Sequence, residues 1–197
     1  MKRDVLWAFS YLGVAGQVLI VLMLLIALLA FLGVRSPLAT VRRWLWGYEL
    51  WAGFVVASLA TGGSLFYSEI MSFTPCEFCW YQRICMYPMS ILLLVFAVFR
   101  EHRASRYLLV LPIGGACVSI YHMLIAYHAI HELAACSANG GSCAFNWLTV
   151  PAQNVSLGYL AIPTLALTAF LLLIGFLVLA ATGTTGDVAT LPTDAER

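Results

Sequence analysis

The sequence predicts an all-α integral membrane protein with five transmembrane helices. Of its 197 residues, 62% are hydrophobic and only 10% are charged, so the chain lacks the charged surface that a soluble domain of this length needs. Long apolar stretches recur along the chain, and each exceeds the ~18 residues that indicate a spanning helix. The alternating pattern of a membrane barrel is absent, so the spans are expected to be helices. A net charge of +1 leaves no basic surface for nucleic acid.

Five apolar stretches give the predicted helices in chain order. They cover residues 5–33, 45–70, 79–99, 107–130 and 157–181, and each can cross about 30 Å of hydrocarbon. The first could instead be a signal peptide, because Lys2 and Arg3 precede it. Its apolar core is too long for that, and no clear small-residue cleavage site follows. Residues 1–181 are therefore expected to form one membrane domain, and residues 182–197 a disordered tail.

Pairs of small residues indicate where the helices pack closely. Ser58 and Gly62 in the second span, and Gly115 and Ser119 in the fourth, have the four-residue spacing that lets helix backbones approach one another. We expect contact faces at both places.

Arginines in the connections predict the orientation in the membrane. They fall before the second span and between the third and fourth spans: Arg35, Arg42, Arg43, Arg100, Arg103 and Arg106. Because basic connections stay on the cytoplasmic side, both groups and the C-terminal tail are expected there, with the N-terminus outside. Lys2 and Arg3 oppose this arrangement, and the reversed topology is the alternative.

Four of the six cysteines lie in connections that this topology places outside the cytoplasm: Cys76, Cys79, Cys136 and Cys143. Disulfides persist on that side. The first pair has CxxC spacing and leads into the third span, so Cys79 is expected near a helix N-terminus, which stabilises a thiolate. The second pair lies in a Gly-rich loop, where the two sulfurs can meet or either can reach another disulfide; a static staple is the alternative. Two pairs on one oxidising face predict electron transfer between them.

Three polar residues near the first pair are further candidates. Arg83 follows Cys79 by four residues on the same helix face, and an ionisable residue at membrane depth is a functional candidate that could favour a thiolate or bind a polar cofactor oxygen. Snorkelling to headgroups is its alternative role. Gln82 could add a hydrogen bond, and His122 could pass protons, although a lone His in a bundle is more often structural. Cys85 and Cys117, inside apolar spans, are expected to be structural.

One segment resembles a known family signature. It runs Pro-Cys-Glu-Phe-Cys-Trp-Tyr-Gln-Arg-Ile-Cys-Met-Tyr-Pro from Pro75 to Pro88 and resembles the DsbB/BdbC family of disulfide-bond formation proteins, in which CxxC is followed by an aromatic residue and a Gln/Glu-Arg pair. Tyr121-His122 and the run from Gly158 to Pro163 extend the resemblance over roughly residues 45–181, nearest to the BdbC branch. It implies a four-helix transmembrane bundle of the DsbB type, to which the first span is an addition.

The resemblance also implies a reaction, that of a membrane thiol:quinone oxidoreductase. A DsbA/BdbD-like thioredoxin-fold partner would be oxidised by the Cys136–Cys143 disulfide, and electrons would pass to Cys76–Cys79 and then to a membrane quinone. Cys136 would form the mixed disulfide with the partner, and Cys143 and Cys76 would bridge the two loops during transfer. The C-x6-C loop is short, so this step could differ from that of relatives with a long loop.

A quinone site is implied around the first pair. Cys79 would face the quinone and Arg83 would bind or polarise it, with Gln82 and His122 as further contacts. The BdbC-like run Trp80-Tyr81-Gln82 favours menaquinone over ubiquinone.

Three other classes remain as alternatives. Vitamin K epoxide reductase-like proteins perform related chemistry, but there the loop cysteines precede the CxxC, the reverse of the order here. A metal-handling or transporter subunit would need four thiolates converging on one ion. A structural scaffold would have neither a redox-active pair nor a bound quinone.

Overall fold

The computed structural model describes residues 2–34, 36–72, 74–127, 129 and 161–188. Within these residues five helices are long and apolar enough to cross a membrane, which confirms the predicted all-α bundle with an additional N-terminal helix. The elements are α1 (Lys2–Phe31), α2 (Ser36–Leu45), α3 (Glu49–Leu65), the π-helix η1 (Phe66–Ile70), α4 (Glu77–Phe99), the 3₁₀-helix η2 (His102–Ala104), α5 (Ser105–Leu108), α6 (Val110–Ala126) and α8 (Ile162–Val188).

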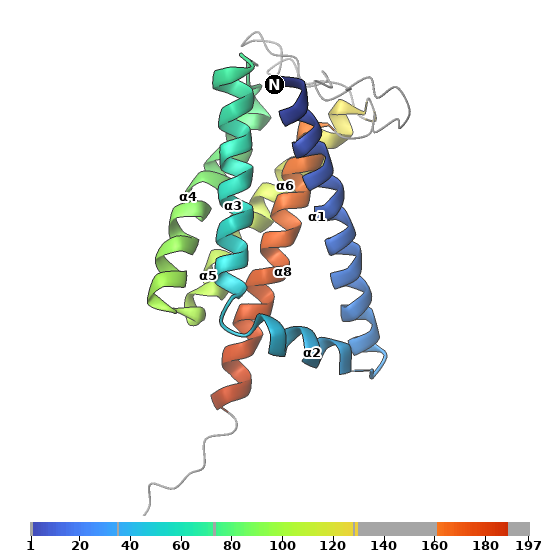
Figure 1. Ribbon diagram of the computed structural model, residues 1–197, viewed down its shortest axis with the longest axis vertical. Helices are drawn as coiled ribbons and strands as arrows, with labels where there is room; N and C mark the ends of the chain where they lie inside the picture. Colours follow the sequence, from blue (N-terminus) through green and yellow to red (C-terminus); the bar gives the residue numbers. More distant parts are fainter. Residues whose placement is uncertain (1, 35, 73, 128, 130–160, 189–197) are drawn as a thin grey trace, which may run out of the picture.

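The last helix, α8, is the centre of the bundle. It packs against α1, α3 and α6, and α4 completes the bundle by packing against α3 and α6 (Figure 1). Phe170 and Leu173 of α8 and Met89 and Leu93 of α4 are fully buried and belong to one core cluster. Most large apolar side chains of α1 face outward. The core is therefore formed by α3, α4, α6 and α8.

Small residues allow close approach at one predicted face and not at the other. Gly115 lies directly against the Phe170 ring, so the predicted contact face of the fourth span is confirmed. The prediction for Gly62 is wrong, because an added Cβ there would meet nothing within 4 Å. Two other glycines of α3 are buried instead: Gly53, which faces Leu93, and Gly63, which faces Phe9 of α1.

The predicted helix ends differ in several places. The first span begins at Lys2 and ends at Phe31, and the fourth ends at Ala126, short of the predicted 130. Pro75 precedes a helix that starts two residues before the predicted 79, at Glu77. The last helix runs to Val188, so the first residues of the expected disordered tail are helical.

The basic connection before the second membrane span contains a helix that was not predicted. Helix α2 is short and amphipathic, with Arg42 and Arg43 in its last turn. It crosses the end of the bundle between α1 and α3 (Figure 1), and Arg42 donates a hydrogen bond to the Thr182 carbonyl of α8 at 3.0 Å. Trp44 is 82% exposed. Basic and aromatic side chains on such a helix are typical of the membrane interface.

The described arginines of the two basic connections, Arg42 and Arg43 in one and Arg100, Arg103 and Arg106 in the other, lie at the same end of the molecule. Helix α2, the connection from α4 to α5 and the C-terminal end of α8 are at one end, whereas the start of α1 and the start of α4 are at the other (Figure 1). This arrangement is the one that the predicted topology requires. Which end faces the cytoplasm stays a prediction.

Candidate functional site

The first cysteine pair lies at the start of α4. Cys76 is the N-cap residue, with an extended backbone (φ −73°, ψ 173°), and Cys79 is in the first turn. The Trp80 N–H donates to the Cys76 carbonyl at 3.2 Å, which closes that turn and brings the two sulfurs to 3.1 Å. The sulfurs need to approach by only about 1 Å to form a disulfide. The pair is thus arranged for thiol–disulfide chemistry at a helix N-terminus, as predicted.

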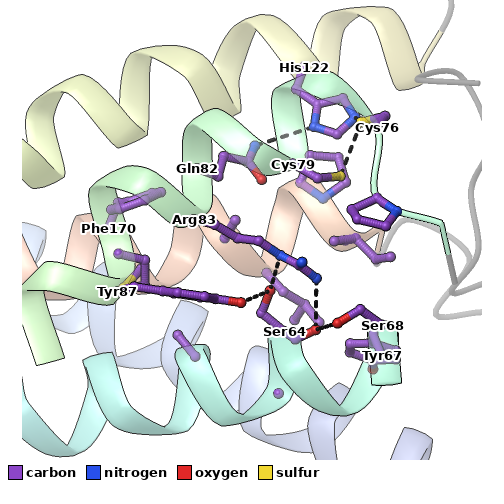
Figure 2. A pocket seen from close by; sticks show the side chains of 18 of the residues that line it. Ser64, Tyr67, Ser68, Cys76, Cys79, Gln82, Arg83, Tyr87, His122 and Phe170 are labelled. Atoms are coloured by element: carbon purple, nitrogen blue, oxygen red, sulfur yellow. Dashed lines mark hydrogen bonds between the residues drawn. The ribbon is translucent and has the colours of Figure 1, made fainter. Parts of the chain in front are cut away.

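The imidazole ring of His122, on α6, contacts this cysteine pair. Its Nε2 is 3.6 Å from the Cys76 sulfur, and its Nδ1 is 3.3 Å from Nε2 of Gln82. The Gln82 amide nitrogen can only donate, so Nδ1 accepts and the ring proton of the neutral imidazole is on Nε2. The Nε2–H group therefore points at Cys76 (Figure 2). Gln82 and His122 are both buried.

These contacts favour the thiolate form of Cys76. A hydrogen bond from the Cys79 thiol lowers the pKa of Cys76 most, burial opposes this, and the hydrogen bond from His122 lowers the pKa further. The sequence predicted the thiolate on Cys79 instead. Since the two sulfurs are in hydrogen-bond contact, a proton that passes between them exchanges these roles.

Arg83 is held by a serine of the neighbouring helix α3. Its Nε donates to Ser64 Oγ at 3.0 Å and its Nη2 donates to the Ser64 carbonyl at 3.1 Å. The Tyr87 hydroxyl lies 3.5 Å from the same Oγ (Figure 2), and the guanidinium lies 5.2 Å from the Trp80 ring centre. The guanidinium therefore bonds inside the bundle and does not follow the snorkelling alternative.

The backbone next to Ser64 is irregular. Two residues further on, at Phe66, α3 becomes the π-helix η1, and the Met71 N–H donates to the Phe66 carbonyl at 3.1 Å. Such π-helical turns occur often at functional sites, because they redirect side chains and carbonyls. Here Tyr67 and Ser68 of η1 line the same cavity as Arg83.

A cavity opens beside the cysteine pair. Its volume is about 140 Å³, roughly ten times the ~10–15 Å³ that one water needs. The polar part of its wall includes five predicted site residues, Cys76, Cys79, Gln82, Arg83 and His122, together with Ser64, Tyr67, Ser68 and Tyr87. The apolar part includes side chains of α3, α4 and α8: Leu59, Ala60, Met86, Leu165, Ala166 and Phe170. Polar and apolar side chains thus line the same cavity beside the cysteines.

The predicted site residues thus have different outcomes. Five of them meet at one cavity, whereas Cys136 and Cys143 lie outside the described residues. Cys85 packs against the core cluster, and Cys117 faces outward from α6.

Several cavity residues were not predicted. The sequence contained a signal for Ser64, Ser68 and Tyr87, because an Arg within a membrane span needs acceptors and Ser64 and Ser68 are four residues apart in an apolar span. Phe9 of α1 also lines the cavity, and no pattern in the sequence indicates it.

The same cluster offers three possible metal ligands. The donor atoms of Cys76, Cys79 and His122 lie within 4.8 Å of one another. Two thiolates on a tetrahedral zinc, at about 2.3 Å each, are about 3.8 Å apart. The sulfurs here are closer, at 3.1 Å, so the pair is placed for sulfur–sulfur exchange rather than for an ion between the sulfurs.

The chain is similar to known disulfide formation proteins. The family model described as "Disulfide bond formation protein DsbB" matches residues 42–185. "Disulfide bond formation protein C" of Bacillus subtilis is 42% identical over 134 residues, 66% of this chain and 90% of that protein. "Probable disulfide formation protein C 1" of Bacillus cereus is 39% identical over 133 residues, 68% of this chain and 87% of that protein.

The similarity extends to a more distant relative. "Probable disulfide formation protein" of Deinococcus radiodurans is 35% identical over 131 residues, 66% of this chain and 86% of that protein. No solved structure matches the chain. The family match contains the cysteine pair and every cavity residue described above except Phe9, and it covers well over half of the sequence. The chain therefore belongs to the DsbB family of disulfide bond formation proteins.

Proposed function

We propose that this protein is a membrane thiol:quinone oxidoreductase that reoxidises an extracytoplasmic, DsbA/BdbD-like thioredoxin-fold partner. Its family assigns it thiol oxidation in a bacterial membrane, which the helical bundle crosses several times. One observation carries the finer proposal: the Cys76–Cys79 pair lines a cavity that also contains Arg83 and has apolar side chains of α3, α4 and α8 in its wall. Such a cavity fits a membrane-soluble electron acceptor.

The residues of this cavity fit a quinone. A quinone has a flat ring with carbonyl oxygens and an apolar tail, and it needs hydrogen-bond donors at one end and apolar walls around the rest. Arg83 has five N–H donors, of which the bonds to Ser64 use two, so further N–H groups can face a carbonyl oxygen. Met86, Leu165 and Phe170 supply apolar wall. A bound quinone supplies an acceptor for two electrons and two protons, and it leaves as quinol.

The cysteine pair donates the electrons and protons, and His122 stabilises the thiolate that forms. When Cys76 and Cys79 form their disulfide, two electrons and two protons must leave the pair. The contacts that lower the Cys76 pKa make its proton the first to leave. The Nε2–H of His122 then stabilises the remaining negative charge, and Gln82 keeps that proton on Nε2. Arg83 provides positive charge at the same cavity.

The second cysteine pair connects this site to the partner. The partner's two thiols reduce the Cys136–Cys143 disulfide, with Cys136 forming the mixed disulfide. The new thiols then reduce the Cys76–Cys79 disulfide through a Cys143–Cys76 bridge. Each step exchanges one disulfide for two thiols, so electrons balance along the chain. The family resemblance supports this order, and Cys76 is suited to the bridge because it precedes the first turn of α4.

The orientation and the preferred quinone are parts of the same proposal. The cysteine end would face the extracytoplasmic side with the N-terminus, and α2, the other arginine connection and the C-terminus would face the cytoplasm. Menaquinone is proposed over ubiquinone because of the BdbC-like sequence after Cys79. The match to Bacillus proteins named for disulfide formation is in line with that branch.

Anaerobic stopped-flow absorbance of the purified protein tests the proposal. The protein is mixed with a reduced thioredoxin-fold oxidase and with menaquinone or ubiquinone. We expect Cys79→Ser and Cys136→Ser to abolish quinone reduction, and Cys85→Ser and Cys117→Ser, as matched controls, to keep it. No turnover with either quinone would contradict the proposal and would make metal analysis of the reduced protein the next step.

A further inference from the structure

The N-terminal helix contributes to the cavity although it lies outside the family match. That match begins at residue 42, after α1 has ended at Phe31. Phe9 of α1 nevertheless lines the cavity that contains Cys79 and Arg83. The other cavity residues all lie between Leu59 and Phe170, inside the match. The additional helix therefore supplies one side chain, Phe9, to the wall of a cavity whose other lining residues all lie in the family core.

Close packing fixes α1 against α8. A Cβ added at Gly16 would lie 2.9 Å from Thr168 and 3.3 Å from Leu172, and one added at Gly175 would lie 2.9 Å from the Met23 sulfur. Glycines on both helices thus bring the two backbones together, which is how helices associate tightly in lipid. Because α1 is held at two levels of α8, the position of Phe9 is determined by the fold.

Phe9 reaches from α1 to α3. Gly63 leaves the space for its ring, because an added Cβ at Gly63 would lie only 2.8 Å from Phe9 Cε1. The ring centre is 6.2 Å from that of Phe66 and 5.7 Å from that of Tyr67. Helix α1 therefore packs on α8 and touches α3 through Phe9, so it bridges the two helices on this side of the cavity. Gly63 also directly precedes Ser64, the residue that holds Arg83.

We propose that Phe9 determines quinone affinity by closing the side of the cavity between α3 and α8. This inference rests on the proposed function, because it takes a quinone as the ligand. An aromatic ring in this wall adds apolar contact to a quinone ring near Arg83 and separates it from the surrounding lipid. The additional helix is then a specificity element of the reaction and not only a membrane anchor.

Kinetics with two quinones test the proposal: a naphthoquinone without a tail and one with an isoprenoid tail. Because an aromatic contact is lost, Phe9→Ala should raise the KM for both about three- to tenfold, with kcat within about twofold. Phe9→Leu should have a smaller effect, since it keeps part of the apolar wall. Val18→Ala is the matched control, because Val18 is on the same helix but 63% exposed. Thiol exchange with the partner should not change in any of these variants.

Gly63→Ala gives an independent route to the same result. The added methyl displaces the Phe9 ring without removing it, so the quinone KM should rise. In a Phe9→Ala background the same substitution should have little further effect, because the clash is gone. The effects of the two substitutions on the quinone KM should therefore not add, as expected if both act through the Phe9 ring.

Two results would overturn the inference. One is an unchanged quinone KM in Phe9→Ala and Gly63→Ala protein that unfolds at the wild-type temperature. The other is a parallel loss of kcat, thiol exchange and thermal stability in every Phe9 variant, which would make Phe9 a packing residue only. Failure of the wild-type protein to reduce any quinone is a different outcome, since it would overturn the proposed function.

Discussion

Arg83 of α4 holds Ser64 of α3 by two hydrogen bonds, one to the side-chain oxygen at 3.0 Å and one to the backbone carbonyl at 3.1 Å. The two bonds fix the guanidinium plane relative to α3, because Nε and Nη2 both take part. Arg83 therefore faces the cavity in a defined orientation, and Ser64 acts as its positioning residue.

Ser64→Ala should weaken quinone use and leave thiol exchange intact. The substitution removes the acceptor of the Arg83 Nε bond and keeps the backbone acceptor, so the guanidinium can rotate. We expect kcat/KM for quinone to fall about three- to tenfold, because a typical intramolecular hydrogen bond contributes about 0.5–1.5 kcal/mol and the second bond, to the Ser64 carbonyl, remains. Steady-state kinetics with a range of quinone concentrations measure this.

Ser90→Ala is the matched control for that variant. Ser90 is on α4, and its hydroxyl bonds the Tyr87 carbonyl of its own helix at 2.8 Å. It should leave the quinone kinetics unchanged. Equal losses in the two serine variants would mean that Ser64 supports the helix pair in general and does not position Arg83.

Arg83→Lys should restore little of what Arg83→Ala loses. Lysine keeps the charge but cannot bond the Ser64 side chain and carbonyl while facing a ligand. We expect kcat/KM for quinone to fall about 10- to 100-fold in the alanine variant, and nearly as far in the lysine variant. Partner oxidation in a single turnover should be unaffected in both. Arg106→Ala, at an exposed arginine of α5, is the control, and unchanged quinone kinetics in Arg83→Ala would remove the proposed role of Arg83.

His122→Ala should shift the pH dependence of Cys76 reactivity to higher pH. In the reduced protein, Cys79 and His122 lower the Cys76 pKa, so its thiolate persists at neutral pH and is lost only as the pH falls through that lowered pKa. Removing His122 takes away one stabilising donor and raises the pKa part of the way towards ~8.5, its usual value. The thiolate is then lost at a higher pH than in wild type as the pH falls, so the alkylation rate declines at a higher pH.

Mass spectrometry of iodoacetamide-labelled protein measures this shift, with fragment ions separating Cys76 from Cys79. The rate is recorded from acid to alkaline pH in wild type, His122→Ala and His102→Ala. His102, in η2 after the end of α4, is the control and should give the wild-type profile. A His122→Ala profile that coincides with wild type would show that His122 does not stabilise the Cys76 anion.

The sequence predicted the helical bundle and the cysteine turn well, because both depend on local patterns. Hydropathy marks each membrane span directly, and the CxxC spacing places both cysteines in one helical turn. The contact between Cys76 and His122 joins the start of α4 to α6, and the sequence did not predict it. No helical period can pair residues on different helices, so packing had to reveal it.

Other features were missed for identifiable physical reasons. The arginines of α2 were interpreted only as a charged connection, although Arg42 and Trp44 lie on an amphipathic helix. The π-helical turn η1 has no sequence signature, so the position of Tyr67 and Ser68 at the cavity could not be predicted. Phe9 looks like any apolar residue of a membrane span, and only the missing side chain of Gly63 gives its ring a place against α3.

Gly115→Ala should destabilise the bundle, whereas Gly114→Ala should not. A methyl group at Gly115 would overlap the fully buried Phe170 ring, which is enclosed by the core and cannot move freely. Such overpacking costs about 1–3 kcal/mol, which would lower the thermal midpoint in detergent. At Gly114 an added Cβ meets nothing within 4 Å, so the better helix propensity of alanine should stabilise the protein by up to about 1 kcal/mol. Since the two glycines are adjacent in α6, equal midpoints for both variants would show that α6 and α8 separate easily there, and that the Phe170 wall of the cavity is less rigid than this packing implies.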